Sequence, residues 1–226
     1  MSNNYGPRIV TDGLVLCWDA ADNNSYPGSG STTYDLAGNN NGSFINSPSI
    51  NDNYGKCFDF SGTNDRIECV NDINYGSSAS WEAWAYRYSS VNVLNMFMGD
   101  HLPYFAMRSY GDVLFSTSIN GSQRSLVSSQ SISSNIWYHF VFTIEYDGST
   151  NTTMRIYING SLDSSASYTG VQTNYAEYKF AIGDGRNTNW YQFNGQVALA
   201  RIYNSKALSA SEVLQNYQAN KGRFGL

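Results

Sequence analysis

Hydrophobic and polar residues alternate with a period of two along most of this chain, which is the pattern of strands with one buried face. Tight-turn residues separate these stretches, and Asn159-Gly160 marks the clearest hairpin because both residues tolerate positive φ. A long polar segment, residues 21–53, is expected to wrap an edge of the resulting sheets. Strands are predicted over residues 13–20, 56–60, 65–70, 79–87, 92–98, 103–108, 112–119, 123–128, 136–146, 152–159, 161–168, 177–182 and 196–203.

One short helix is predicted after the last strand. Ser209 and Glu212 have the Ser-x-x-Glu spacing of a capping box, so the helix should begin directly after Ser209. Leu208 precedes the cap and can pack on Val213 as a hydrophobic staple. Gly222 is expected to end the helix. Because no internal repeat is visible, these elements predict an antiparallel sandwich of two sheets rather than a propeller or solenoid.

A set of short motifs runs along nearly the whole chain, at residues 13–20, 34–39, 58–65, 80–84, 137–140, 156–160, 181–183, 193–204 and 207–217. Together these motifs resemble the concanavalin A-like jelly roll of the laminin-G-like type. The resemblance implies an all-β, two-sheet antiparallel jelly-roll sandwich with one short C-terminal helix, filling residues 1–226 as a single domain. It also implies that Trp18, Trp81, Trp84 and Trp137 belong to the core. These are scaffold motifs, so they say little about chemistry.

The charge and cysteine content narrow the possible partners and location. A net charge of −5 without a Lys/Arg cluster argues against nucleic acid and anionic membranes as partners. The polar N-terminus lacks the build of a signal peptide, and no apolar run approaches the ~20 residues of a membrane span. A hairpin at residues 61–64 would bring Cys57 and Cys69 near each other, but alternation places Cys57 outward and Cys69 inward. We therefore expect three free thiols, which fits synthesis in a cytosol.

Catalytic patterns are weak in this sequence, and we predict that the protein is not an enzyme. Retaining glycan hydrolases of the same fold carry Glu-x-Asp-x-Glu on one strand, with carboxyl groups ~5 Å apart. Here the one Glu-x-Asp pair, Glu145 and Asp147, runs into Gly148 without a third carboxylate. His139 lies on a strand whose opposite face is apolar, so we interpret it as a packed, hydrogen-bonded histidine.

Glycan recognition needs an aromatic face for the pyranose ring and nearby polar groups for its hydroxyls, usually on loops. Two segments offer both, at residues 100–110 and 184–191. Trp190 has a second interpretation, since a Trp-Tyr pair just before the last strand can also close the core. The candidate glycan-binding residues are Asp184, Arg186, Trp190, Tyr191, His101, Tyr104 and Arg108.

Two further hypotheses concern a metal and assembly. A structural calcium ion would be held by Asp19, Asp22 and Asp35, because oxygen-rich loops supply the ligands that calcium prefers. At the C-terminal end, Phe224 and Leu226 either fold back to cover the sandwich edge or dock on a neighbouring subunit or virion protein.

The sequence therefore predicts a protein of recognition or assembly. The compact sequence resembles those of structural and adhesion proteins of tailed bacteriophages. This resemblance implies a virion-surface component made in the host cytoplasm. Such a component would be a capsid decoration or a tail or fibre module. Its partners would be virion proteins or copies of itself, with host glycan as a possible ligand. The alternative is a free-standing bacterial protein that binds or cleaves carbohydrate.

Overall fold

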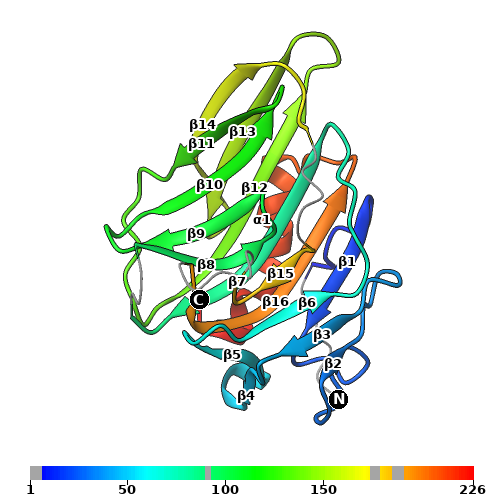
Figure 1. The fold of residues 1–226 in the computed structure, drawn as a ribbon, viewed down its shortest axis with the longest axis vertical. Coiled ribbons are helices and arrows are strands. Elements are labelled where there is room, and N and C mark those ends of the chain that lie inside the picture. The colour runs from blue at the N-terminus through cyan, green and yellow to red at the C-terminus, as the bar shows by residue number, and fades with distance from the viewer. Residues whose placement is uncertain (1–6, 90–92, 174–178, 185–190) are drawn as a thin grey trace.

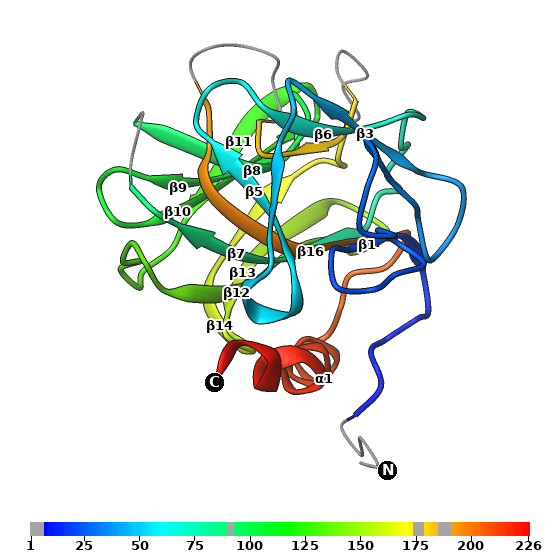
Figure 2. The same ribbon diagram turned by 90° about the horizontal axis from the view of Figure 1, so that it is seen from below.

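The computed structural model describes residues 7–89, 93–173, 179–184 and 191–226. Within these ranges, two antiparallel sheets of eight strands pack face to face, and one α-helix covers the outside of one of them (Figures 1 and 2). We call the sheet under the helix the back sheet and the other one the front sheet. No helix within the described ranges is long and apolar enough to cross a membrane.

The strand order confirms the predicted two-sheet jelly-roll sandwich. The back sheet runs β14 (Ser161–Thr169), β13 (Asn151–Ile158), β12 (Trp137–Tyr146), β7 (Ala79–Arg87), β16 (Asn194–Asn204), β5 (Cys57–Ser61) and β4 (Ser49–Asn51), with β1 (Leu14–Asp19) also paired to β16. The front sheet runs β11 (Ser122–Val127), β10 (Val113–Ile119), β9 (Tyr104–Arg108), β8 (Leu94–Gly99), β15 (Ala181–Ile182), β6 (Arg66–Cys69), β3 (Gly42–Ile45) and β2 (Thr32–Thr33).

Aromatic side chains fill the space between the sheets. Phe105 of the front sheet stacks on Phe142 of the back sheet with 4.4 Å between ring centroids, and Trp81 lies 5.4 Å from Phe105. Trp84, three residues after Trp81, lies instead in a cluster with Phe224 beneath the C-terminal segment. Strand β7 is therefore buried on both faces, by the front sheet on one side and by the C-terminal segment on the other.

The predicted tight turns are confirmed where local sequence specifies them. Asn159 and Gly160 have φ of 50° and 82°, and they join β13 to β14. Asn120 and Gly121 have φ of 50° and 72°, and they join β10 to β11. Positive φ at both central positions is the requirement of the two-residue hairpin turn that suits the twist of the strands.

The helix α1 (Ala210–Asn220) begins where the sequence predicts. The Ser209 N–H donates to Glu212 Oε2 over 2.8 Å, and the Glu212 N–H donates to Ser209 Oγ over 3.4 Å. Leu208 and Val213 pack in the same buried cluster, which supports the hydrophobic staple. The first turn is thus fixed by local contacts that the sequence spacing already contains.

The prediction that Gly222 ends the helix is wrong. The chain continues as a 3₁₀ helix, η2 (Lys221–Phe224), and leaves it at Gly225, whose φ is 73°. The extra turn brings the Phe224 ring onto Trp84 with 4.1 Å between centroids. Burial of this aromatic ring favours one more helical turn over a stop at Gly222.

The expected hairpin between Cys57 and Cys69 is also wrong. Strand β5 pairs within the back sheet and β6 within the front sheet, so the turn at residues 61–65 crosses from one sheet to the other. Cys57 faces away from the inter-sheet core as expected, but Trp84 and Phe224 bury it completely. Cys17, Cys57 and Cys69 are all free thiols, which confirms that part of the prediction.

The polar segment at residues 21–53 contributes three short strands that the sequence pattern does not reveal. Strands β2 and β3 end the front sheet and β4 ends the back sheet, so the segment does wrap an edge of the sandwich.

The strict alternation of buried and exposed positions predicted for the last strand fails in β16, because a bulge between Val197 and Leu199 shifts the register against β7. Val197 and Ala200 point into the core, whereas Ala198 and Leu199 lie under the C-terminal segment.

Candidate functional site

An apolar row of side chains crosses the outer face of the front sheet, the face turned toward the viewer in Figure 1. Met96, Ala106, Leu114 and Val127 lie opposite one another on the adjacent strands β8, β9, β10 and β11. Tyr191 packs against this row, and the main chain of Tyr191 accepts a hydrogen bond from the Met96 N–H at 3.0 Å. The segment before β16 therefore lies along β8 at the border of this face.

A polar row runs beside the apolar one. Tyr104, Ser116 and Ser125 are in register on β9, β10 and β11, so their side chains share the outer face. Gln123 Nε2 lies 3.3 Å from both Tyr104 Oη and Ser116 Oγ, and it donates to each. The two serine hydroxyls are 2.5 Å apart. Gln123 and Ser125 are exposed, so solvent or a ligand can reach this hydroxyl and amide group.

A charged pair borders the apolar row on its other side. The Arg108 guanidinium donates two hydrogen bonds to Asp112, from Nε at 2.5 Å and from Nη2 at 2.6 Å. These bonds to Asp112 raise the pKa of Arg108, although partial burial opposes them. The Tyr110 ring lies 5.4 Å from the same guanidinium and is 72% exposed. The pair is close to neutral, and it supports an aromatic ring that faces solvent.

The structure brings several of the predicted glycan-binding residues to this face. Tyr104 and Arg108 both lie on β9, and Tyr191 packs against the apolar cluster that includes Tyr104. His101 is half-buried in the connection before β9. Tyr104 contributes its hydroxyl rather than its ring, because its side chain is only 4% exposed.

Of the remaining three predicted residues, one is buried and two lie outside the described residues. Asp184 is fully buried two residues after β15, and its role in binding a ligand stays a prediction. Arg186 and Trp190 lie outside the described residues. The two interpretations of Trp190, core or binding platform, stay open.

The three aspartates predicted to bind calcium have protein partners. Asp35 accepts three backbone N–H groups at 2.8–3.0 Å, and Asp19 accepts Arg223 Nη1 at 2.7 Å. Asp22 accepts the backbone N–H of Asn24 at 2.8 Å. Within the described ranges no three His, Cys, Asp or Glu side chains group in a way that could hold a metal ion. These carboxylates act as loop caps, and calcium binding stays a prediction.

The C-terminal apolar residues separate into two environments. Phe224 is only 6% exposed, and its ring centroid lies 4.7 Å from that of Trp137. Phe224 therefore folds back, as one of the two interpretations predicts. Docking of Phe224 on another protein is therefore wrong. Leu226 is 46% exposed, and its docking stays a prediction.

A buried polar network under α1 was not predicted from the sequence. Glu82 of β7 accepts hydrogen bonds from Arg201 Nη1 at 2.7 Å, Asn216 Nδ2 at 2.7 Å and Tyr203 Oη at 3.3 Å, and it contacts His139 Nε2 at 3.1 Å. Each of the five side chains is at most 3% exposed. His139 is thus a packed, hydrogen-bonded residue, as predicted, and the network joins three strands of the back sheet, β7, β12 and β16, to the helix.

The Glu82 carboxylate is charged in this setting. Burial by itself raises the pKa of Glu82, but Arg201, His139 and Asn216 together lower it to about 2. A sequence signal for this site did exist. Trp81 and Trp84 lie on opposite faces of one strand, so burying both requires a cover on the face that also carries Glu82.

The model of the Concanavalin A-like lectin/glucanases superfamily matches residues 61–214. No curated protein matches the chain by sequence.

Solved structures show the same fold. One is domain 4 of AbnA, an extracellular GH43 arabinanase from Geobacillus stearothermophilus in complex with arabinotriose. It has a TM-score of 0.69 and 19% identity, with 91% of this chain and 98% of that chain covered. Another is the receptor binding domain of botulinum neurotoxin mosaic serotype C/D, with a TM-score of 0.65, 19% identity and coverage of 92% and 51%.

A third is the Trypanosoma rangeli sialidase in complex with the inhibitor DANA, with a TM-score of 0.65, 14% identity and coverage of 93% and 33%. The chain therefore spans nearly all of the arabinanase domain, about half of the toxin domain and a third of the sialidase. At these identities the likeness concerns the fold.

Proposed function

This chain belongs to the Concanavalin A-like lectin/glucanases superfamily, and we propose that it is a lectin-like protein that binds glycans on the outer face of its front sheet. The observation that carries the proposal is the exposed Tyr110 ring on Arg108, together with the exposed Gln123 amide and Ser125 hydroxyl on the same face. The apolar row between them is buried, with Met96 and Ala106 at 0% and Leu114 at 7% exposed, so it supports these groups from beneath. Ligand sites of this kind combine apolar contact area with a few placed polar groups.

The chemistry of these rows suits a pyranose. A sugar ring has an apolar face that packs on an aromatic ring, and Tyr110 offers such a face with Arg108 behind it. Its hydroxyl groups need donors and acceptors, which Gln123 and Ser125 provide at the surface. Since Asp112 already neutralises Arg108, a neutral glycan is favoured over an acidic one.

The fold neighbours support the proposal without deciding the ligand. The arabinanase domain was solved with arabinotriose, and the sialidase with DANA. Nearly all of the arabinanase domain and a third of the sialidase share the fold with this chain, at under 20% identity.

Titration with soluble oligosaccharides tests the proposal. Tyr110→Ala and Gln123→Ala should each weaken binding by about 1 kcal/mol, or about five-fold, through loss of a stacking face or a hydrogen bond. Trp190→Ala should weaken binding to a similar extent if that ring is the platform. Tyr34→Ala is the matched control, because Tyr34 is also an exposed tyrosine (47%) but lies near the other end of the front sheet. Equal affinity in the front-sheet variants and the control would refute this assignment.

We further propose that the protein does not cleave its glycan. The Glu145–Asp147 pair supports this part of the proposal through its present contacts. Glu145 is about half-exposed and forms an ion pair with Arg155 at 2.7 Å. Asp147 caps its own turn, where backbone N–H groups of Asn151, Ser149 and Thr150 lower its pKa to about 2. Asp147 is therefore not held in the protonated form that a general acid requires.

The biological setting is a separate part of the proposal. We propose a bacteriophage virion-surface protein, a capsid decoration or a tail or fibre module, with virion proteins or its own copies as partners. What supports it is the resemblance of the sequence to phage structural and adhesion proteins. Mass spectrometry of purified virions tests it directly. Absence of this chain from virions, with secretion by a bacterium, would favour the alternative of a free-standing carbohydrate-binding protein.

A further inference from the structure

An aromatic strip emerges from beneath the C-terminal segment onto the outer face of the back sheet. Trp137, which contacts Phe224, lies 5.5 Å from Tyr86 and 5.5 Å from Tyr54 between ring centroids. The strip continues from Tyr86 to Tyr88, again at 5.5 Å. It is therefore a continuous series of rings that begins in a buried cluster and ends at the surface.

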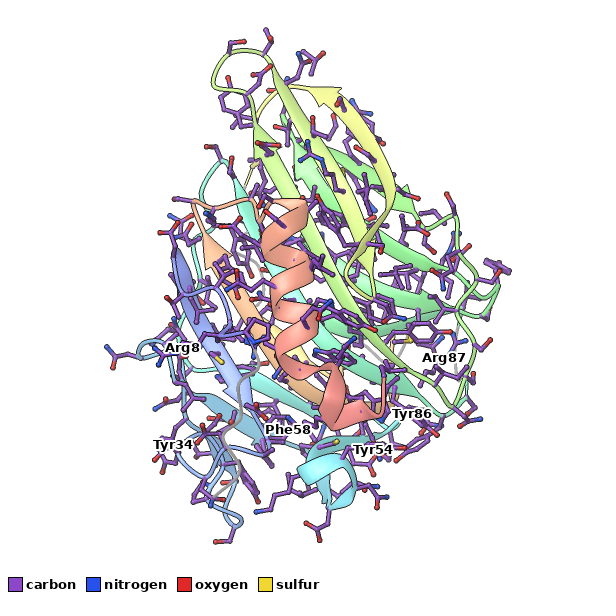
Figure 3. All side chains as sticks on the ribbon, turned by 180° about the vertical axis from the view of Figure 1, so that it is seen from behind. Arg8, Tyr34, Tyr54, Phe58, Tyr86 and Arg87 are labelled. Carbon is purple, nitrogen blue, oxygen red and sulfur yellow. The ribbon has the colours of Figure 1, made fainter. Side chains whose placement is uncertain are left out.

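The rings become more exposed with distance from the helix. Trp137 is 4% exposed, Tyr86 and Tyr88 are half-buried, and Tyr54 is 44% exposed. We call Tyr54, Tyr86 and Tyr88 the tyrosine patch. Figure 3 looks onto this face and shows Tyr54 and Tyr86 beside the C-terminal end of the helix. The front sheet lies on the opposite side of the molecule (Figure 2).

A row of polar side chains meets the tyrosine patch in strand register. Asp59 of β5 lies opposite Gln196 of β16, which lies opposite Tyr86 of β7. The Tyr88 hydroxyl donates to Asp59 Oδ2 at 3.0 Å and accepts a hydrogen bond from Gln196 Nε2. Asn51 Nδ2 also donates to Asp59 Oδ2, at 3.3 Å. These bonds fix the polar groups beside the rings before any ligand arrives.

The charge of this surface selects among ligands. Asp59 is the charged member of the row, and it would repel an acidic sugar. The neighbouring guanidinium of Arg223 is already bonded to Asp19 and to the carbonyl groups of Tyr54 and Lys56. A carboxylate and amides beside tyrosine rings match the hydroxyl groups and apolar face of a neutral sugar. A protein partner fits less well, because the centres of protein interfaces are depleted of charged residues.

We propose that the tyrosine patch with Asp59, Asn51 and Gln196 is a second glycan-binding surface that takes a neutral oligosaccharide. A sugar ring packs on Tyr86, and its hydroxyl groups bond to Asp59 and Asn51. This surface is separate from the front-sheet site and does not depend on it. A protein with both sites binds two glycan chains from opposite sides.

Amide chemical shifts in a ¹H–¹⁵N correlation spectrum can test this surface separately from the front sheet. The probes are cellohexaose, xylohexaose, mannohexaose and arabinotriose as neutral oligosaccharides, with sialyllactose as the acidic comparison. We expect at least one neutral probe to shift amides of residues 57–61 and 86–88, and sialyllactose to leave them unchanged. Tyr86→Ala should weaken that binding about five-fold, by removing the stacking face.

Three further variants make the result decisive. Asp59→Asn keeps the side-chain shape and should also weaken binding, with the melting temperature as a check on folding. Tyr34→Ala is the control for loss of an exposed tyrosine, and Tyr110→Ala should leave the response at residues 57–61 and 86–88 intact. Shifts confined to the front sheet would refute this second site and leave the proposed function standing. Shifts confined to the back sheet would do the reverse.

Other outcomes also overturn the second site. One is the absence of back-sheet shifts with every neutral probe. Another is an affinity that neither Tyr86→Ala nor Asp59→Asn changes. A wild-type dimer in sedimentation that Tyr86→Ala dissociates, without a sugar response, would show that a second copy of the chain occupies this surface instead.

Discussion

Replacing Glu82 by glutamine tests whether the buried network holds α1 on the back sheet. Glutamine keeps the size of the side chain but removes its charge, so Arg201 stays buried at 3% exposure without its counter-ion. Removing one partner of a buried ion pair costs about 3–5 kcal/mol. We expect Glu82→Gln to lower the free energy of unfolding by about 3 kcal/mol, a large part of the roughly 5–15 kcal/mol typical of a domain.

The same network predicts a pH dependence. The pKa of Glu82 is about 2, against an ordinary value of 4.5, so the folded protein binds this proton more weakly than the unfolded chain does. The stabilisation is therefore complete above about pH 4.5 and is lost as the pH falls toward 2. The difference between the two pKa values corresponds to about 3 kcal/mol in the free energy of unfolding. Between these pH values, wild-type stability should fall more steeply than that of Glu82→Gln.

Urea unfolding followed by tryptophan fluorescence measures both effects. Glu145→Gln is the matched control, because Glu145 is 52% exposed in its ion pair with Arg155, and its change should stay under about 0.5 kcal/mol. A cost for Glu82→Gln no larger than that of the control would refute the reasoning. So would parallel losses of stability in wild type and Glu82→Gln between pH 4.5 and 2.

Three other expectations can be checked with simple assays. Phe224→Ala should lower stability by about 3 kcal/mol in a thermal melt, because it empties a site stacked on Trp84, whereas removing Leu226 alone should have little effect. A structural calcium ion at Asp19, Asp22 and Asp35 should raise the melting temperature as millimolar calcium is added, because a ligand that binds only the folded state stabilises it. A melting temperature identical to that in chelator would refute calcium binding and leave these carboxylates as loop caps. Incubation with β-glucans should release no reducing ends, and release that disappears in Glu145→Gln would contradict the non-catalytic proposal.

Local features of this fold could be predicted from sequence, because neighbouring residues determine them. Asn159-Gly160 specifies its turn by backbone preference alone, and Ser209 with Glu212 specifies the helix start within one turn. The end of the helix escaped prediction because it depends on a distant partner. Phe224 reaches Trp84 only after one more turn, so the stop at Gly222 expected from local preference is overridden.

Features that depend on partner choice could not be predicted from sequence. A turn at residues 61–65 looks the same whether it joins neighbouring strands or crosses between sheets, so the separation of Cys57 from Cys69 required the structure. The rows of the candidate site combine residues from four strands, and only their register brings Gln123 to Tyr104. Local sequence likewise does not reveal that Asp184, a polar residue in a loop-like segment, is fully buried.

The pairing of β1 with β16 bears on how this protein folds. Leu16 of β1 lies opposite Ile202 of β16. The two paired strands are therefore separated in sequence by nearly the whole chain. β16 also separates β7 from β5, so the middle of that sheet stays open until it inserts. Contacts so remote in sequence are late and slow to form, which predicts refolding on a scale of about milliseconds to seconds. Until then β7 exposes an unpaired edge, and aggregation during refolding should depend on protein concentration.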